Sequence, residues 1–502
     1  ILFWYGIVSY YNQEYEKSAQ LSSQVSQDYN TLTVAPLLGY SLIKIDKAKE
    51  AIDVLIKTLN DKKGASKREL EGVLFILIEA LVKEKDVKKL LFYQKDFLSY
   101  RTVSPQYQAY LPYLKYLIAS AYLDEMVVEL HNPKTYPQYI ENALLVLNQK
   151  SPQYDSFLSQ GDILLLKKVE DFYQKNKNKA KPYIFKNKVY ILKENKGTTT
   201  FANQQISGQA FFDENLLPVY NNGLELFSRF IFYFSRGKIL IQNEVQVVDA
   251  TVTEVKEEPW ANEKTGEKTL ILQPVFETIL HYPSQDILKN KNSFDGFAFL
   301  YPFIDGANPI YNTKSIAFSG PTNPMLVPYT LNLKARRAGA TFGIGSSGFY
   351  RFAHVMVHEF FHNIEINYQE GIPHIWNPQF KSLWPQWFKG GKEFDYYDAY
   401  FRNVVDKAGY QKLYLRQTPD PLTKKDYQDL LDKAKNFSPQ NLTKAKGFLE
   451  EGFKEYRLEN YDKALSLLLE SHKLFPYSDD LNNRIAYIYY SKKKDYKNVR
   501  IN

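Results

Sequence analysis

Apolar residues recur at helical spacing near both ends of the chain. The stretches ELEGVLFILIEALVKEKDVKKLLFYQKDF and YLPYLKYLIASAYLDEM place apolar positions three and four residues apart, which is the period of one helix face. The segment LEEGFKEYRLENYDKALSLLLESHKLFPYSDD follows the same period near the other end. The first and last parts of the chain are therefore predicted to be helical.

The pattern changes after Pro182. Segments such as KVYILKENKG, KILIQNEVQVVDATVTEV and KTLILQPVFETIL alternate or run with β-branched and aromatic residues between Gly, Asn and Pro, as strands do. Helical spacing returns in NNGLELFSRFIFYFSR and again from about Phe349 to Asn367. We expect an α+β domain over residues 181–420, flanked by helical segments at 1–180 and 421–502.

Small residues recur at a fixed spacing within both helical segments. Gly39 precedes Ala51 by twelve residues, Gly452 precedes Ala464 by twelve, and Gly6 precedes Gly39 by 33. Such residues mark the close crossing of two helices. This pattern resembles the tetratricopeptide repeat, which implies helical hairpins that present a concave surface to a protein partner. The alternative is a helical shoulder that only packs on the middle domain.

Composition excludes several classes of function. The 502 residues contain no cysteine, so disulfides, thiolate metal sites and cysteine nucleophiles are all excluded. The formal charge of +8 is spread out, and the basic run KNKNKAKPYIFKNK has no stacking aromatic motif after it; we expect a solvated linker there and no nucleic-acid partner. The longest apolar run, 72–82, is about half a membrane span, so no transmembrane segment is expected.

The start of the sequence and the lack of cysteine favour export. The chain begins with Ile1 in place of Met, which is typical of a chain from which a signal peptide has been removed. We expect a periplasmic or extracellular protein, with the cytoplasm as the alternative.

Histidine is rare but clustered. Three of the seven histidines, His354, His358 and His362, are spaced four residues apart and share one face of the expected helix. His358 and His362 can bind one Zn²⁺ ion through neutral imidazoles, while Glu359 accepts a proton from the metal-bound water. His354 is expected to be a packed residue rather than a ligand.

The His-Glu-x-x-His motif, preceded by strands and a glycine-rich turn, resembles the zincin metallopeptidases. The resemblance implies a zincin-like catalytic domain with an antiparallel or mixed sheet and an active-site helix. It also implies a zinc-dependent peptidase acting on a protein or peptide substrate, with Glu359 as general base. Because Glu365 and Tyr368 stand where the metzincin branch has Gly and His, the gluzincin branch is the closer resemblance.

The sequence leaves the identity of the third metal ligand open. Gluzincins place a Glu on a second helix, and Glu393 lies 31 residues after His362, so it is the first candidate. Asp395 and Asp398 are the alternatives on the same expected helix. The sequence departs from the usual Asn-Glu-x-x-x-Asp pattern, since Lys392 precedes Glu393 and Tyr397 follows four residues later.

Three further residues are candidates for supporting roles. Glu365 lies seven residues after His358 and could orient a ligand imidazole, while His374 and Tyr397 could stabilise an oxyanion. A second hypothesis needs none of this chemistry. In that hypothesis the chain is a non-catalytic interaction scaffold of the tetratricopeptide type, and its zincin-like domain is structural or inactive.

Overall fold

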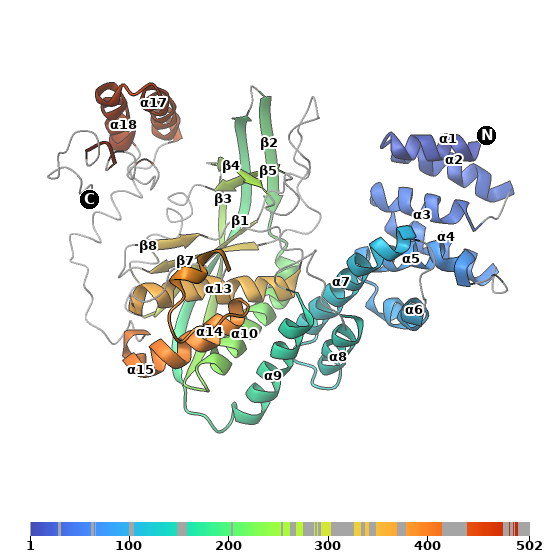
Figure 1. Ribbon diagram of the computed structural model, residues 1–502, viewed down its shortest axis with the longest axis horizontal. Coiled ribbons are helices and arrows are strands. Elements are labelled where there is room, and N and C mark those ends of the chain that lie inside the picture. The colour runs from blue at the N-terminus through green and yellow to red at the C-terminus, as the bar shows by residue number, and fades with distance from the viewer. Residues whose placement is uncertain are drawn as a thin grey trace.

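The computed structural model shows a chain that is mostly helical around one mixed sheet (Figure 1). It describes residues 2–28, 32–61, 65, 67–99, 105–147, 158–201, 204–252, 255–261, 268–274, 286, 289, 293–302, 326–332, 337–340, 348–368, 378–413, 439–474, 481, 485 and 487–489. None of the described helices is long and apolar enough to span a membrane.

Nine helices precede the first strand in the described chain: α1 (Leu2–Tyr11), α2 (Tyr15–Asp28), α3 (Val34–Lys44), α4 (Ala48–Asp61), α5 (Lys67–Lys83), α6 (Val87–Ser99), α7 (Pro105–Val128), α8 (Tyr136–Val146) and α9 (Gln160–Asn176). The first six form three successive hairpins, and α2 contacts α3 while α4 contacts α5. The helical prediction for this segment is confirmed.

The hairpins share one turn. A residue with positive φ ends the first helix of each: Gln13, Asp46 and Lys85. The N–H after it bonds back to the carbonyl five residues earlier, at 2.8 Å for Glu14 to Ser9, 2.9 Å for Lys47 to Leu42 and 3.0 Å for Asp86 to Leu81. This satisfies the last carbonyls of the helix in the manner of a Schellman motif.

A close helix approach lies at a constant distance from this turn. Seven residues before the positive-φ residue stands Gly6 in the first hairpin and Gly39 in the second. A Cβ on Gly39 would lie 2.9 Å from Cδ1 of Leu55, and one on Gly6 would lie 3.2 Å from Oγ of Ser22. Each contact joins residues sixteen apart. The glycine is needed because a side chain there would push the two helices of the hairpin apart.

The third hairpin keeps the turn without the glycine. Ile78 stands seven residues before Lys85 and is fully buried. The repeat therefore continues beyond α4, although the Gly and Ala positions of the earlier hairpins do not. Its turn geometry persists, and its helix crossing is filled by a larger side chain.

A fourth hairpin stands near the other end of the described chain. It consists of α17 (Pro439–Arg457) and α18 (Tyr461–Leu474), and it repeats the turn with Glu459 at positive φ. Gly452 takes the glycine position, and a Cβ there would lie 2.8 Å from Cδ2 of Leu468. Leu481, Ile485 and Ile488 cover Ala464 and Leu468 to form a core separate from the main one.

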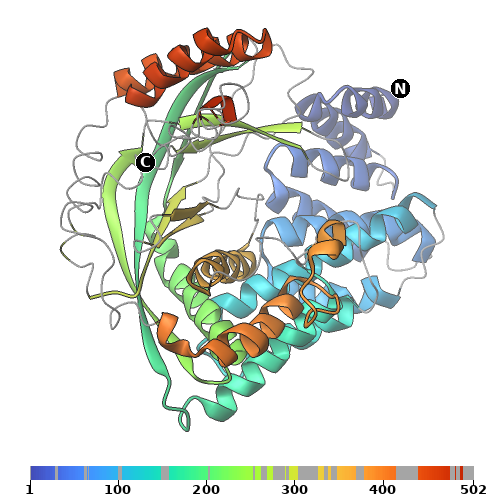
Figure 2. The same ribbon diagram turned by 60° about the vertical axis from the view of Figure 1, so that its left-hand side comes forward.

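The sheet is built on one long strand, β1 (Tyr183–Phe201), which curves through the molecule (Figure 2). The remaining strands are β2 (Gln204–Phe211), β3 (Ile239–Val252), β6 (Gly296–Pro302), β7 (Leu326–Asn332) and β8 (Arg337–Ala340), with β4 (Val255–Ala261) and β5 (Lys268–Pro274) as a separate antiparallel ribbon. The order is β2-β1-β6-β7-β8, and β3 pairs with β1. Since the β3 pairing overlaps those of β6 and β2, β3 occupies the opposite edge of β1.

Polar pairs fix the register of the parallel β1–β3 ladder. Asn187 lies opposite Asn243 and donates a hydrogen bond to its side chain at 2.9 Å. Lys188, which is buried, lies opposite Glu244 and pairs with it at 2.6 Å. A slip of one residue would separate both pairs and move them to the other face of the sheet.

Two helices cover the sheet. Helix α10 (Leu217–Phe234) follows the short 3-10 turn η1 (Glu214–Leu216), connects β2 to β3 and contacts both β3 and α13 (Phe349–Tyr368). Helix α13 also contacts β7 and β8. Against this pair lies α14 (Glu393–Tyr400), which continues into η3 (Phe401–Val405) and α15 (Asp406–Ala408); η2 (Pro378–Leu383) precedes it and η4 (Tyr410–Leu413) follows.

The predicted fold class needs correction. At the centre of the sheet β1 pairs in parallel with both β3 and β6, and antiparallel pairing in the described sheet is left to β2, β7 and β8. Helices form most of the described chain. The fold is thus a largely helical one around a sheet with a parallel centre, and the prediction of a zincin-like α+β domain is wrong. The prediction failed because a short motif on one helix does not determine the topology of the strands and helices around it.

Candidate functional site

Helices α13 and α14 bring His358 and Glu393 into direct contact. Nδ1 of His358 lies 2.5 Å from Oε1 of Glu393, and both side chains are buried. Tyr397, one turn after Glu393, donates its hydroxyl hydrogen to the same carboxylate oxygen and lies 2.9 Å from Nδ1 of His358. The three groups form one hydrogen-bonded cluster in the core.

The charges of this cluster stabilise each other. Burial alone would lower the pKa of His358, but the Glu393 carboxylate outweighs it and raises this pKa to about 9. Burial would likewise raise the pKa of Glu393, yet His358 outweighs it and lowers that pKa to about 2. Burial and the same carboxylate raise the pKa of Tyr397 well above its ordinary value. At neutral pH the cluster is an imidazolium–carboxylate pair beside a neutral phenol.

Two other glutamates on α13 face the same region. Glu359 is fully buried, and its Oε1 lies 3.9 Å from Nε2 of His358. Glu365, two turns after His358, accepts a hydrogen bond from the Tyr396 hydroxyl at 3.1 Å. Glu365 therefore contacts α14 through Tyr396.

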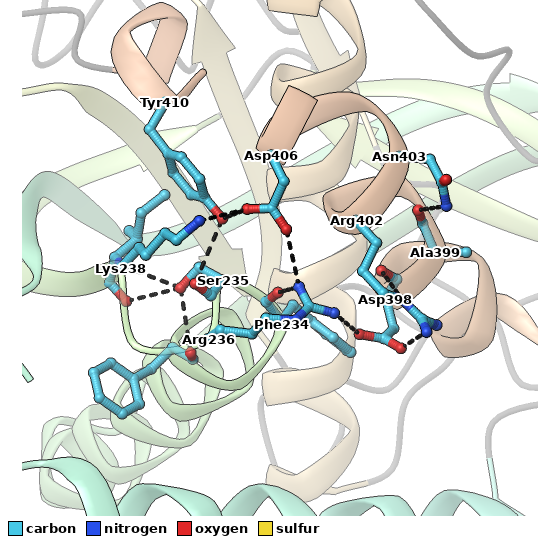
Figure 3. Close-up of polar contacts among 12 residues, drawn as sticks. Phe234, Ser235, Arg236, Lys238, Asp398, Ala399, Arg402, Asn403, Asp406 and Tyr410 are labelled. Atoms are coloured by element: carbon cyan, nitrogen blue, oxygen red, sulfur yellow. Dashed lines mark hydrogen bonds and ion pairs between the residues drawn. The ribbon is translucent and has the colours of Figure 1, made fainter. Parts of the chain in front are cut away.

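The alternative ligands Asp395 and Asp398 have other partners. Asp395 accepts a hydrogen bond from the backbone N–H of Lys392 at 2.8 Å and so helps to begin α14. Asp398 pairs with Arg236 at 3.1 Å and with Arg402 at 2.5 Å, as Figure 3 shows. Neither carboxylate has a described contact with His358.

Part of the predicted site lies outside what the structure describes. The backbone of His362 belongs to α13, but its side chain is outside the described residues, and so is the whole of His374. His354 is buried, and its ring lies 4.0 Å from that of Phe394, which agrees with a packed residue.

The prediction of a zinc peptidase is corrected, while the predicted ligands His358, His362 and Glu393 stay a prediction. Among the described residues no three His, Asp or Glu side chains are grouped so that they could hold a metal ion. The labels hydrolase, metalloprotease and gluzincin are therefore withdrawn. The Zn²⁺ ion itself stays a prediction, since the side chain of His362 is not described.

A second candidate site lies on the helical hairpins. The positions just after Gly6 and Gly39, and the matching position in α5, are Ile7, Tyr40 and Glu79. Tyr10, one turn further along α1, meets the ring of Tyr40 edge-on with centroids 5.6 Å apart. We call Tyr10, Tyr40, Lys44 and Glu79 the tyrosine row.

The tyrosine row combines aromatic faces with charge. The Lys44 ammonium lies 5.1 Å from the centroid of the Tyr40 ring, a cation–π distance. Burial raises the pKa of the Tyr10 hydroxyl, and the charges of Tyr40 and Glu79 act in the same direction. The row thus crosses three successive hairpins. Sequence reasoning missed it among 40 tyrosines; its signal is the position of Tyr40 and Glu79 relative to the hairpin turn.

Comparison with known proteins gives little further information. No family model matches the chain, and no curated protein matches it. Among solved structures, the crystal structure of the yeast Tom70 is similar at 10% identity with a TM-score of 0.22. The alignment covers 99% of this chain and 66% of that chain, so the chain spans about two thirds of the length of that protein. A TM-score this low does not establish a shared fold.

The resemblance to a zincin metallopeptidase is accordingly wrong. No family model supports it, and the described residues contain no group able to hold a metal ion. The features that remain are the buried His358–Glu393 pair and the four hairpins of one geometry.

Proposed function

We propose that the chain is a non-catalytic protein-interaction scaffold whose helical hairpins bind a protein partner. The observation that carries the proposal is the constant register of the hairpins, in which the turn follows residues 6, 39, 78 and 452 by seven positions each time. Hairpins in one register place equivalent helix faces side by side, and such arrays present extended surfaces to proteins.

The tyrosine row is the part of this surface best suited to binding. Tyrosine rings offer large contact area at low entropic cost, and they are enriched where partners bind most strongly. Lys44 is exposed, and its ammonium lies over the Tyr40 ring. The row therefore fits a partner segment that carries an apolar or aromatic side chain and a carboxylate for Lys44.

The middle domain has a structural part in this proposal. His358, Glu393 and Tyr397 join α13 to α14 through buried hydrogen bonds. The N-terminus of α13 is in turn fixed by Asp124 of α7, which accepts the backbone N–H of Tyr350 at 3.2 Å. The middle domain thus contacts α7, the helix that follows the third hairpin and packs against it.

The test begins with a photo-crosslinking amino acid in place of Tyr40 in the full chain, exposed to an extract of the source cells. The control carries the same amino acid in place of Leu145, which is exposed on α8. We expect a protein that crosslinks from position 40 and not from 145. Its affinity for the purified chain is then measured by titration, and Tyr40→Ala with Lys44→Ala should lower it about tenfold or more.

A second arm tests the absence of catalysis. The captured partner is incubated with the parent chain and with Glu359→Gln, and its mass is followed. The scaffold proposal expects an intact partner in both cases and equal affinity for the two chains. Cleavage by the parent that is lost in Glu359→Gln would overturn it.

A further inference from the structure

Helix α13 begins without a capping side chain of its own. An early hydrogen bond of the helix runs from the Phe352 N–H to the Gly348 carbonyl at 3.1 Å, so Gly348 stands at the N-cap position. The usual N-cap residues, Ser, Thr, Asp and Asn, accept a free N–H of the first turn with their side chains. Glycine cannot do so, and these N–H groups need an acceptor from elsewhere in the chain.

Asp124, near the end of α7, is such an acceptor. Its Oδ1 accepts the backbone N–H of Tyr350 at 3.2 Å, across 226 positions of the sequence. A Cβ on Gly348 would lie 2.5 Å from the same oxygen. The Asp124 carboxyl group therefore occupies the space that the side chain of an N-cap residue would fill, and it joins the helical array to the first turn of α13.

The end of α7 is also held by α10. The Nδ2 of Asn222 donates hydrogen bonds to the carbonyl oxygens of Val127 and Val128 at 2.9 and 3.2 Å. The last turn of α7 thus contacts both helices that cover the sheet. We call this turn of α7, with Asn222 and the first turn of α13, the α7 junction.

The surroundings of Asp124 favour its neutral form. Burial raises the pKa of its carboxyl group to about 7, although the Tyr350 N–H and the charges of Lys85 and Arg351 act to lower it. Lys85 belongs to the turn between α5 and α6, and its ammonium lies 5.4 Å from the centroid of the Phe349 ring. Arg351 belongs to the first turn of α13. The two cations therefore compensate only part of the cost of burying a carboxylate.

We propose that Asp124 is a proton-controlled clamp between the helical array and the middle domain. With its proton, Asp124 accepts the Tyr350 N–H and places no negative charge in the junction. Without the proton, the carboxylate is better solvated by water, so α7 and the first turn of α13 separate more often. Because the pKa is higher in the closed junction than the ordinary value of 3.8, opening becomes more frequent as the pH rises from 3.8 to about 7 and is constant above that.

Hydrogen exchange of the Tyr350 and Phe352 amides in the full chain tests the clamp between about pH 5 and pH 8. At each pH the rate is divided by that of Asp124→Asn, which keeps an acceptor oxygen and cannot ionise, so the intrinsic pH dependence of exchange cancels. We expect the ratio to rise by up to about tenfold per pH unit below pH 7 and to level off above it. A ratio that stays the same at every pH overturns the proposal.

A second variant leaves Asp124 in place. Lys85→Met removes a positive charge that lowers the Asp124 pKa, so the pH at which opening becomes constant should move upward from that of the parent. An unchanged pH overturns the proposal, even if Asp124→Asn does not fold.

The matched control is Glu125→Gln, which removes the neighbouring carboxylate on α7, whose charged neighbours are Glu129 and Lys88. It should exchange like the parent at every pH. A control that loses the pH dependence would assign it to Glu125 and overturn the role of Asp124. These measurements are independent of the tyrosine row, which is tested separately.

Discussion

Gly452 on α17 faces Leu468 on α18 so closely that a methyl group on Gly452 would stand 2.8 Å from Cδ2 of Leu468. Gly447, in the same helix, has no atom within 4 Å of the position that a Cβ would take. The two glycines thus separate the effect of helix propensity from that of packing.

Alanine at these two positions should have opposite effects. Gly447→Ala should stabilise the hairpin by up to about 1 kcal/mol through helix propensity. Gly452→Ala gains the same propensity but forces Leu468 to move, and overpacking of this kind costs about 1–3 kcal/mol. Hydrogen exchange of the α17 and α18 amides measures both. Equal protection in the two variants would contradict the close approach.

The turn of the last hairpin can be improved. Glu459 has φ of 61°, a conformation that costs a residue with a side chain about 1–2 kcal/mol and glycine little. Glu459→Gly should therefore slow hydrogen exchange in α17 and α18, despite the greater freedom that glycine has in the unfolded chain. Glu459→Val is the contrasting variant and should speed exchange. A Gly variant less protected than the parent would show that the turn is not strained.

The ion pair of Arg229 and Glu170 joins α10 to α9 inside the core. The two side chains are 2.5 Å apart and each is 4% exposed. Glu170→Ala leaves the guanidinium with Glu225, which is partly exposed, and with the ring of Tyr173, and should lower the free energy of unfolding by about 3–5 kcal/mol. The test is chemical denaturation of the parent, of the single variants at Glu170 and Arg229, and of the variant that carries both changes. A double variant as unstable as the sum of the single ones would mean that the pair is not coupled.

The His358–Glu393 pair predicts a definite pH dependence in buffer that contains a chelator. The His358 pKa is raised from 6.5 to about 9, so its contribution is complete below pH 6.5 and is lost as the pH rises through 9. The Glu393 pKa is lowered from 4.5 to about 2, so its contribution is complete above pH 4.5 and is lost as the pH falls through 2. Thermal unfolding of the parent should therefore lose stability on both sides.

The matched variant for this pH profile is Glu393→Gln, which keeps the shape of the side chain and removes its charge. Without the carboxylate, burial lowers the pKa of His358, so the stability that the parent loses above pH 6.5 should be absent from the variant. Identical profiles for parent and variant would show that the pair is not ionised in the folded protein.

Elemental analysis decides the zinc prediction. The sequence predicts about one zinc ion per chain in protein purified without chelator, and much less in Glu393→Ala, because that variant lacks one of the three predicted protein ligands. Asp395→Ala is the control, since that carboxylate bonds to the start of its own helix. If the protein contains no zinc after refolding in the presence of the metal, the prediction of a bound zinc ion is wrong.

The sequence predicted the helices better than the contacts between them. The helix expected from Phe349 to Asn367 spans Phe349–Tyr368, because its apolar period is unbroken. The hairpins were visible through Gly39 and Gly452, but the third was missed because Ile78 stands where the others have glycine, so the residue that marks the helix crossing is absent.

The candidate site was predictable only in part. The spacing of α14 from α13 identified Glu393, which does meet His358. It could not exclude Asp398, because the partner that holds Asp398 is Arg236, 162 residues away at the end of α10. Strand direction was equally hidden, since it depends on α10 crossing from β2 to β3.

The long strand β1 has a mechanical consequence. Its 19 residues extend roughly 60 Å, from the end of α9 to the hairpin with β2 (Figure 2). Tension applied between that hairpin and the helical array would run along β1 and shear its parallel ladder with β3. Hydrogen bonds loaded in shear break together rather than one at a time, so the ladder of β1 and β3 would resist a pull between these two points.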